Sequence, residues 1–221
     1  MQTARPTLAI IGGTGTLGSG LARRLAASGH YAIVIGSRDP ARAEAAAKSL
    51  PAKAGAPSPR GTSNVEAAQS GDVVLVAVPW GNHAAILDEI KPHVAGKLVV
   101  DTTVPLVPPR VARVQLPPET SAALAAQKRL GDTVRVVAAF HNVAAHKLRT
   151  DATIDCDVLI FGNDPKERAV VAAMAEAAGL RGVHAGPLAN AVAAEALTSV
   201  LIGINRNYKV DGAGIRITGI G

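Results

Sequence analysis

Residues 7–30 read TLAIIGGTGTLGSGLARRLAASGH, and this stretch decides the fold. A short apolar run ends at glycines, and the residues from Leu17 onward place apolar side chains at helical spacing until Gly29. Read from Gly13, the glycines match the pattern G-x-G-x-x-G, which allows a tight turn and the close approach of a pyrophosphate to a helix N-terminus. The stretch predicts a strand, a phosphate-binding turn and a helix, with a glycine-rich turn that binds no ligand as the alternative.

Short apolar runs alternate with alanine-rich helical stretches along the rest of the chain, which is typical of a parallel sheet. Further strands are expected at 31–35, 72–78, 97–101, 134–140, 157–161 and 182–185. Helices are expected at 40–50, 65–70, 82–90, 119–130, 143–148, 165–178 and 188–205. Two proline-rich segments, 51–60 and 104–118, are expected to run over the surface as loops.

This order of elements predicts an α/β fold, with a doubly wound parallel Rossmann-type sheet and a small C-terminal α/β extension. The proposed division gives an NADP-binding domain at residues 1–150 and a C-terminal part at 151–221. That boundary is faint, and one continuous domain is the alternative.

Composition narrows the possible functions. Hydrophobic residues make up 48% of the 221 residues and charged residues 18%, which excludes a disordered chain. The single cysteine, Cys156, excludes a disulfide framework and a multi-cysteine zinc site. The net charge of +6 favours anionic partners, but aromatic residues are only 2% and the cations are dispersed, so nucleic acid is not expected. The apolar stretches are too short to span a membrane, and a cytoplasmic protein that binds small anionic molecules is expected.

The residues after the second predicted strand select the dinucleotide. NAD-binding proteins usually carry an acidic residue here, whereas this chain has Ser37 and Arg38. A carboxylate would repel a 2′-phosphate, while a hydroxyl and a guanidinium bind it. Arg42 lies one helical turn further on and adds a second positive charge. The pattern predicts NADP(H), with ordinary surface residues at the start of a helix as the alternative.

Four further runs carry a resemblance to a known family: VIGSR at 34–38, AVPWGNHA at 77–84, AFHNVAAHKL at 139–148 and AGPLANA at 185–191. With the glycine-rich stretch, and in this order and spacing, they resemble the coenzyme F420-dependent NADP oxidoreductases from Thr7 to about Ile204. The resemblance implies hydride transfer between NADPH and the deazaflavin coenzyme F420, without a metal.

The resemblance also implies roles for individual residues. The pyrophosphate would be held by Gly13, Gly15, Thr16 and Leu17, and Gly18 completes the cofactor-binding glycine motif. The 2′-phosphate would be held by Thr14, Ser37, Arg38 and Arg42. The nicotinamide ribose would lie beside Val78, Pro79 and Trp80, with His83 close by. The deazaflavin side would be lined by His141, Asn142, Val143 and Ala145, and closed by Gly186, Pro187 and Leu188.

His141 is the candidate catalytic residue, because it follows an apolar strand at the edge where α/β folds bind ligands. It would position the reacting ring or donate the proton that accompanies the hydride. Solvent is the alternative proton source, and a purely structural histidine is the alternative interpretation. Two other functions remain open on the sequence: an NADPH-dependent reductase of flavin or ferric iron, and a non-catalytic NADPH sensor.

The last predicted helix is apolar on more than one face, through Leu188, Val192, Leu197, Val200, Leu201 and Ile204. One small domain cannot cover all of these side chains. A second copy of the chain is the natural cover, so a homodimer is predicted.

Overall fold

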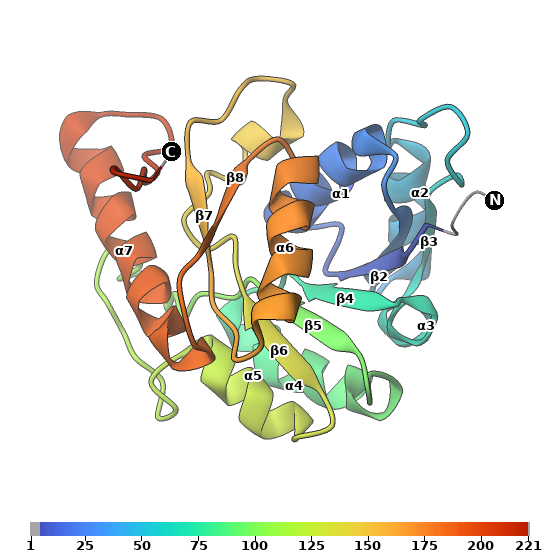
Figure 1. Ribbon diagram of the computed structural model, residues 1–221, viewed down its shortest axis with the longest axis horizontal. Helices are drawn as coiled ribbons and strands as arrows, with labels where there is room; N and C mark the ends of the chain where they lie inside the picture. The colour runs from blue at the N-terminus through green and yellow to red at the C-terminus, as the bar shows by residue number, and fades with distance from the viewer. Residues whose placement is uncertain (1–4, 221) are drawn as a thin grey trace.

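Six parallel strands form the centre of the protein (Figure 1). The structure is a computed structural model that describes residues 5–220. The strands lie in the order β3-β2-β1-β4-β5-β6. The chain adds β2 and β3 on one side of β1 and then crosses back, so that β4, β5 and β6 follow on the other side of β1. This order confirms the predicted doubly wound, Rossmann-type sheet. The strands are β1 Thr7–Ile11, β2 Ala32–Ser37, β3 Arg60–Ser63, β4 Val73–Val76, β5 Leu98–Asp101 and β6 Arg135–Ala138.

Helices cover both faces of this sheet (Figure 1). Along β1, Leu8 and Ile10 point into one apolar cluster, and Ala9 and Ile11 point into the other. Strands buried on both faces are apolar without alternation, which explains why they are conspicuous in the sequence. One face carries α1 Thr16–Ser28, α2 Pro40–Lys48 and α6 Pro165–Ala177, and the other carries α3 Asn64–Ser70, α4 Trp80–Ile90 and α5 Ala122–Leu130.

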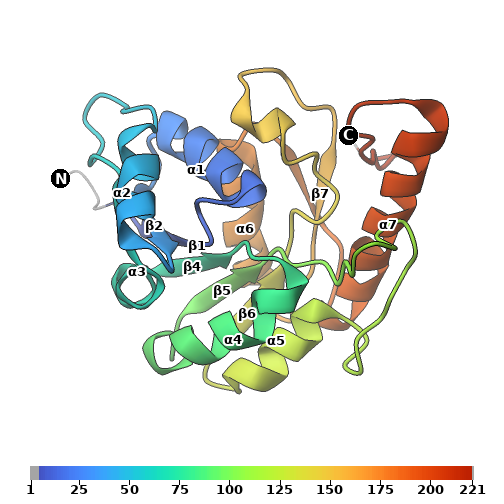
Figure 2. The same cartoon turned by 180° about the vertical axis from the view of Figure 1, so that it is seen from behind.

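The C-terminal part adds a second, two-stranded parallel sheet made of β7 Asp157–Ile160 and β8 Arg181–His184. Phe161, just after β7, forms an antiparallel bridge with Ala138 of β6, with N–H to O distances of 2.8 and 2.9 Å. A short 3-10 helix, η3 Leu188–Asn190, leads into the long helix α7 Ala191–Tyr208. Figure 2 shows α7 beyond β7, away from the six-stranded sheet. The division at about residue 150 stays a prediction.

The chain after α7 is bound back onto β7 by Asp157. This buried carboxylate accepts hydrogen bonds from Arg181 at 2.6 and 2.8 Å, from Arg216 at 3.2 Å and from the backbone N–H of Ile217 at 2.6 Å. The hydrogen bonds from Arg181 lower the pKa of Asp157 despite its burial, so the carboxylate stays charged. This network fixes the C-terminal tail along β7.

Two predictions of local structure are wrong. β3 lies in a region where no strand was expected, because its sequence, RGTS, contains no apolar side chain and it pairs only with β2. Residues 143–148 were expected to be helical, but they form a turn followed by a 3-10 helix, η2 Lys147–Arg149. The Asn142 side chain donates to Ala194 O at 2.8 Å, and the Thr198 hydroxyl donates to His141 O at 2.9 Å. These bonds hold the start of the turn against α7.

Candidate active site

The glycine-rich turn between β1 and α1 is shaped by contacts that leave no room for side chains. Gly12 has φ of +77°, and a Cβ there would stand 2.5 Å from Ala77 O at the end of β4. A Cβ at Gly18 would stand 2.5 Å from Gly12 O, so α1 approaches the turn only because residue 18 is a glycine. Gly15 is the N-cap of α1 and makes no side-chain cap, so the first N–H groups of this helix are available to an anion.

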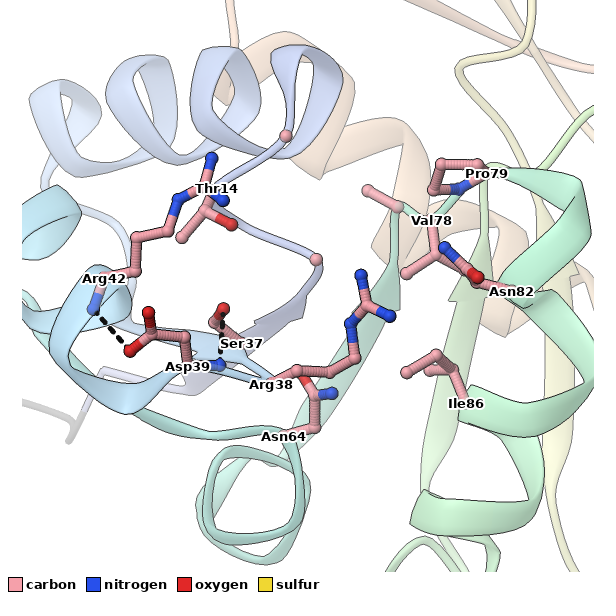
Figure 3. A pocket seen from close by; sticks show the side chains of 13 residues that line it. Thr14, Ser37, Arg38, Asp39, Arg42, Asn64, Val78, Pro79, Asn82 and Ile86 are labelled. Carbon is pink, nitrogen blue, oxygen red and sulfur yellow. Dashed lines mark hydrogen bonds between the residues drawn. The ribbon is translucent and has the colours of Figure 1, made fainter.

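A cavity of about 460 Å³ opens in front of this turn, at the carboxyl ends of β1, β2 and β4 (Figure 3). Doubly wound sheets bind their ligands at this place, where the strand order reverses. The lining residues are Gly12, Thr14, Gly15, Ser37, Arg38, Asp39, Arg42, Asn64, Ala77, Val78, Pro79, Asn82 and Ile86. Seven predicted NADP-site residues are therefore together here: Thr14, Gly15, Ser37, Arg38, Arg42, Val78 and Pro79.

Positive charge dominates one side of this cavity. The Arg38 side chain extends into the cavity, and Arg42 lies on the side of the glycine-rich turn (Figure 3). The acidic residue between them, Asp39, caps α2 by accepting the backbone N–H of Arg42 at 3.2 Å, while its own N–H donates to Ser37 Oγ at 3.2 Å. The Asp39 carboxylate is thus engaged with a helix N-terminus, and the guanidinium groups remain for a phosphate.

His141 belongs to a second, smaller cavity of about 150 Å³ between its own turn, α7 and the C-terminal tail. Its side chain is 7% exposed, and neither ring nitrogen has a hydrogen-bond partner among the described residues. Burial lowers the pKa of His141 to about 4, although the negative charge of Asp101 opposes this shift. At neutral pH the ring is uncharged and offers one N–H donor and one acceptor. Such an unsatisfied buried ring is suited to a polar ligand.

The comparisons with known proteins agree with one another. The family model described as "NADP oxidoreductase coenzyme F420-dependent" matches residues 7–105. An F420-dependent NADP reductase from Methanocaldococcus jannaschii is 38% identical over 222 residues, which cover 96% of this chain and 98% of that protein. One from Methanothermobacter thermautotrophicus is 37% identical over 221 residues, which cover 96% and 95%. This chain belongs to the F420-dependent NADP reductase family. The family resemblance seen in the sequence is confirmed.

A solved structure from Arthrobacter sp. FB24 has the same fold as this member of the F420-dependent NADP reductase family. The TM-score is 0.80, and the match covers 96% of this chain and 99% of that one at 23% identity.

Several predicted site residues of this reductase-family member lie outside the main cavity. Trp80 and His83 of α4 line a groove between α4 and α5, and the His83 ring is turned inward, with Nε2 2.6 Å from Asp101 Oδ2. Gly186, Pro187 and Leu188 connect β8 to α7 and line neither cavity described above. His141, Asn142 and Val143 line the smaller cavity, whereas Ala145 does not. Within residues 5–220 there is no group of three or more side chains suited to hold a metal.

Four residues of functional interest escaped the sequence analysis. Asn64, Asn82 and Ile86 line the main cavity, and Asn64 was missed because the strand before it was missed. Glu195, in the middle of the apolar helix α7, is 2% exposed and accepts the backbone N–H groups of Ala122 and Ala123 at 2.6 and 3.1 Å. Nothing in the sequence indicates that Glu195 contacts Ala122 and Ala123, because they lie far from it along the chain.

Burial raises the pKa of Glu195 to about 8, against the opposing effect of its two backbone hydrogen bonds. Its neighbours on α7, Ala194 and Thr198, accept the hydrogen bonds of Asn142. Helix α7 therefore joins the N-terminus of α5 to the turn that carries His141.

Proposed function

We propose that this protein transfers a hydride between NADPH and the deazaflavin coenzyme F420. The observation that carries the proposal is the cavity that combines Ser37, Arg38 and Arg42 with an uncapped helix N-terminus, in a chain related over nearly its whole length to F420-dependent NADP reductases. Two bound rings would exchange the hydride directly, so the protein contributes mainly by positioning them.

The residues of the main cavity fit NADP. A phosphate on the ribose would meet the guanidinium groups of Arg38 and Arg42 and the hydroxyls of Thr14 and Ser37. The pyrophosphate would accept N–H groups from the turn, where Gly13, Gly15 and Gly18 leave space and Thr16 and Leu17 begin α1. Val78 and Pro79 line the cavity after β4 and would border the nicotinamide ribose.

His141 fits a positioning role toward F420. With a pKa of about 4, its ring is almost entirely uncharged at neutral pH, so it holds a polar group by hydrogen bonds and is a poor acid. The proposal therefore assigns proton exchange to solvent. The three hydrogen bonds between α7 and residues 141–142 fix the backbone at this position.

The proposal includes a cytoplasmic homodimer formed through α7. Within the helical segment 188–208, an 18-residue stretch has a mean hydropathy of 1.4 but is only 33% buried, and by length and composition this segment would also suffice to span a membrane. Val200 is 47% exposed on it. A second copy of the same apolar surface would cover these side chains. Light scattering on the purified protein tests this assembly, with Val200→Glu expected to give monomers.

Mixing the purified protein with NADPH and F420 tests the proposed reaction. The deazaflavin absorbance should disappear as NADPH is consumed. Free flavin and a ferric chelate serve as alternative acceptors under the same conditions. Reduction of either one as fast as F420 would overturn the assignment, and binding of NADPH without any turnover would favour a sensor.

A further inference from the structure

Asn64 lines the main cavity and carries a buried oxygen that no donor satisfies. It is the first residue of α3, directly after β3, and it is 2% exposed. Its Oδ1 is buried and has no hydrogen-bond partner among the described residues. Buried carbonyl oxygens in folded proteins nearly always accept a hydrogen bond. A buried oxygen without a donor, on a residue that lines a ligand cavity, therefore indicates that the ligand supplies the donor.

The orientation of this amide is fixed by the protein. Asn64 Nδ2 donates to Glu89 Oε2 of α4 at 3.3 Å. The flipped amide would bring its oxygen against the Glu89 carboxylate, so Oδ1 must face the other way. There it lies against the bare end of β2, where a Cβ on Gly36 would stand only 3.2 Å from it. The Ser63 hydroxyl also caps α3 by accepting Glu66 N–H at 3.2 Å, which anchors the backbone beside Asn64.

The surroundings of Asn64 suit a flat aromatic ring. Ser63 pairs with Ser37, so Asn64 and Arg38 follow neighbouring strands and lie close together (Figure 3). On the opposite side of the cavity stand the apolar side chains of Ile86 and Val78 (Figure 3). A planar guanidinium stacks on aromatic rings, and aliphatic side chains cover the other ring face. The cavity therefore brings Asn64 together with apolar and planar groups.

We propose that Asn64 recognises the adenine base of the bound dinucleotide, with Oδ1 accepting an N–H of the exocyclic amino group. This rests on the proposed binding of NADPH. Glu89 acts as a positioning residue, because it holds the Asn64 amide in the orientation that presents the oxygen. The pair therefore makes the site selective for a base that carries an amino group at this position.

Reduced nicotinamide hypoxanthine dinucleotide phosphate tests the proposal, since it differs from NADPH in having a carbonyl in place of the amino group. Dissociation constants are measured for both dinucleotides by fluorescence titration. The wild-type protein should bind NADPH about tenfold or more tightly than the analogue, because two acceptors would otherwise face each other. Asn64→Ala should weaken NADPH binding and bring the ratio of the two constants close to one.

Glu89→Ala provides a second variant that leaves the cavity-lining residues intact. Freed from Glu89, the amide can turn, so the preference for NADPH should shrink without disappearing. Asp88→Ala is the matched control, since Asp88 is the adjacent exposed residue on α4 and pairs with Arg129. It should keep the wild-type preference.

The possible outcomes separate the two proposals. If the wild-type protein binds both dinucleotides equally well, the role of Asn64 is overturned while NADPH binding stands. If it binds neither, the proposed function fails as well. An unchanged preference in Glu89→Ala would overturn the positioning role of Glu89.

Discussion

His83 Nε2 lies 2.6 Å from Asp101 Oδ2, and the two side chains are 2% and 1% exposed. Asp101 also accepts the backbone N–H of Thr103 at 2.8 Å. Burial alone would raise the pKa of Asp101, but His83 and Thr103 hold it below its ordinary value. The pair ties the first turn of α4 to the end of β5, between the main cavity and the His141 turn.

Removing His83 should therefore destabilise the protein strongly. His83→Ala leaves the Asp101 carboxylate buried without its partner, and the expected loss in the free energy of unfolding is about 3–5 kcal/mol. Urea denaturation at pH 7 measures this loss. The exposed His30 offers a control, and a loss in His83→Ala no larger than in His30→Ala would show that the pair contributes little.

Arg38→Ala should change the dinucleotide preference. Loss of a charge-assisted bond to the 2′-phosphate is expected to weaken NADPH binding by about 1.5–3 kcal/mol and leave NADH binding nearly unchanged. Calorimetric titration with each dinucleotide gives both values. Arg129→Ala is the matched control, because Arg129 lies on α5, pairs with Asp88 and does not line the main cavity. Equal losses for NADPH and NADH would rule out the 2′-phosphate contact.

His141→Ala should impair turnover of F420 by about 10- to 100-fold through misplacement of the ring, with NADPH affinity close to wild type. Because the pKa of His141 is about 4, the wild-type rate should show no inflection near pH 6.5 from this residue. Steady-state rates between pH 5.5 and 7.5 check both points. His146→Ala is the control, because its half-exposed ring lines the same cavity but pairs with Asp211. Unaltered turnover in His141→Ala would mean that the backbone and the shape of the cavity, and not the His141 ring, position the deazaflavin.

Glu195 should make the protein less stable as the pH rises. Its pKa is about 8 in the folded protein and about 4.5 when unfolded, so between these values the folded state binds more protons. Stability from this group is complete below about pH 4.5 and is lost as the pH rises toward 8. In Glu195→Gln the melting temperature should fall less between pH 6 and pH 9 than it does in the wild-type protein. The control is Glu176→Gln, at an exposed position, whose melting temperature should change with pH as in the wild-type protein. Equal losses in all three proteins would exclude this linkage.

The parts of the structure that could be predicted are those set by local sequence. The strand, glycine turn and first helix follow from a continuous stretch, because Gly12 is required by its φ of +77° and Gly18 by its contact with Gly12 in the same stretch. Arg38 lies on the same cavity as the glycine turn because β2 runs parallel to β1 and ends at the same edge, which the sequence pattern also indicates.

The parts that were missed depend on contacts between distant segments. β3 has no apolar side chain, and its place follows only from pairing with β2, so Asn64 could not be placed either. The inward direction of His83 depends on how α4 packs over β5, and the turn at 141–146 depends on hydrogen bonds to α7. Hydrophobic periodicity contains no information about such polar contacts between elements.

The bridge between Ala138 and Phe161 also bears on solubility. As the last strand of its sheet, β6 has one side that pairs with no other strand of that sheet, and such sides can initiate aggregation. The Gln127 side chain covers part of this side, because its Oε1 accepts the N–H of Val136 at 3.3 Å and its Nε2 donates to Val134 O at 2.9 Å. The bridge occupies the end of that side. Loosening of the C-terminal part would uncover it, so precipitation on heating should begin with local opening near Phe161, before the six-stranded sheet itself unfolds.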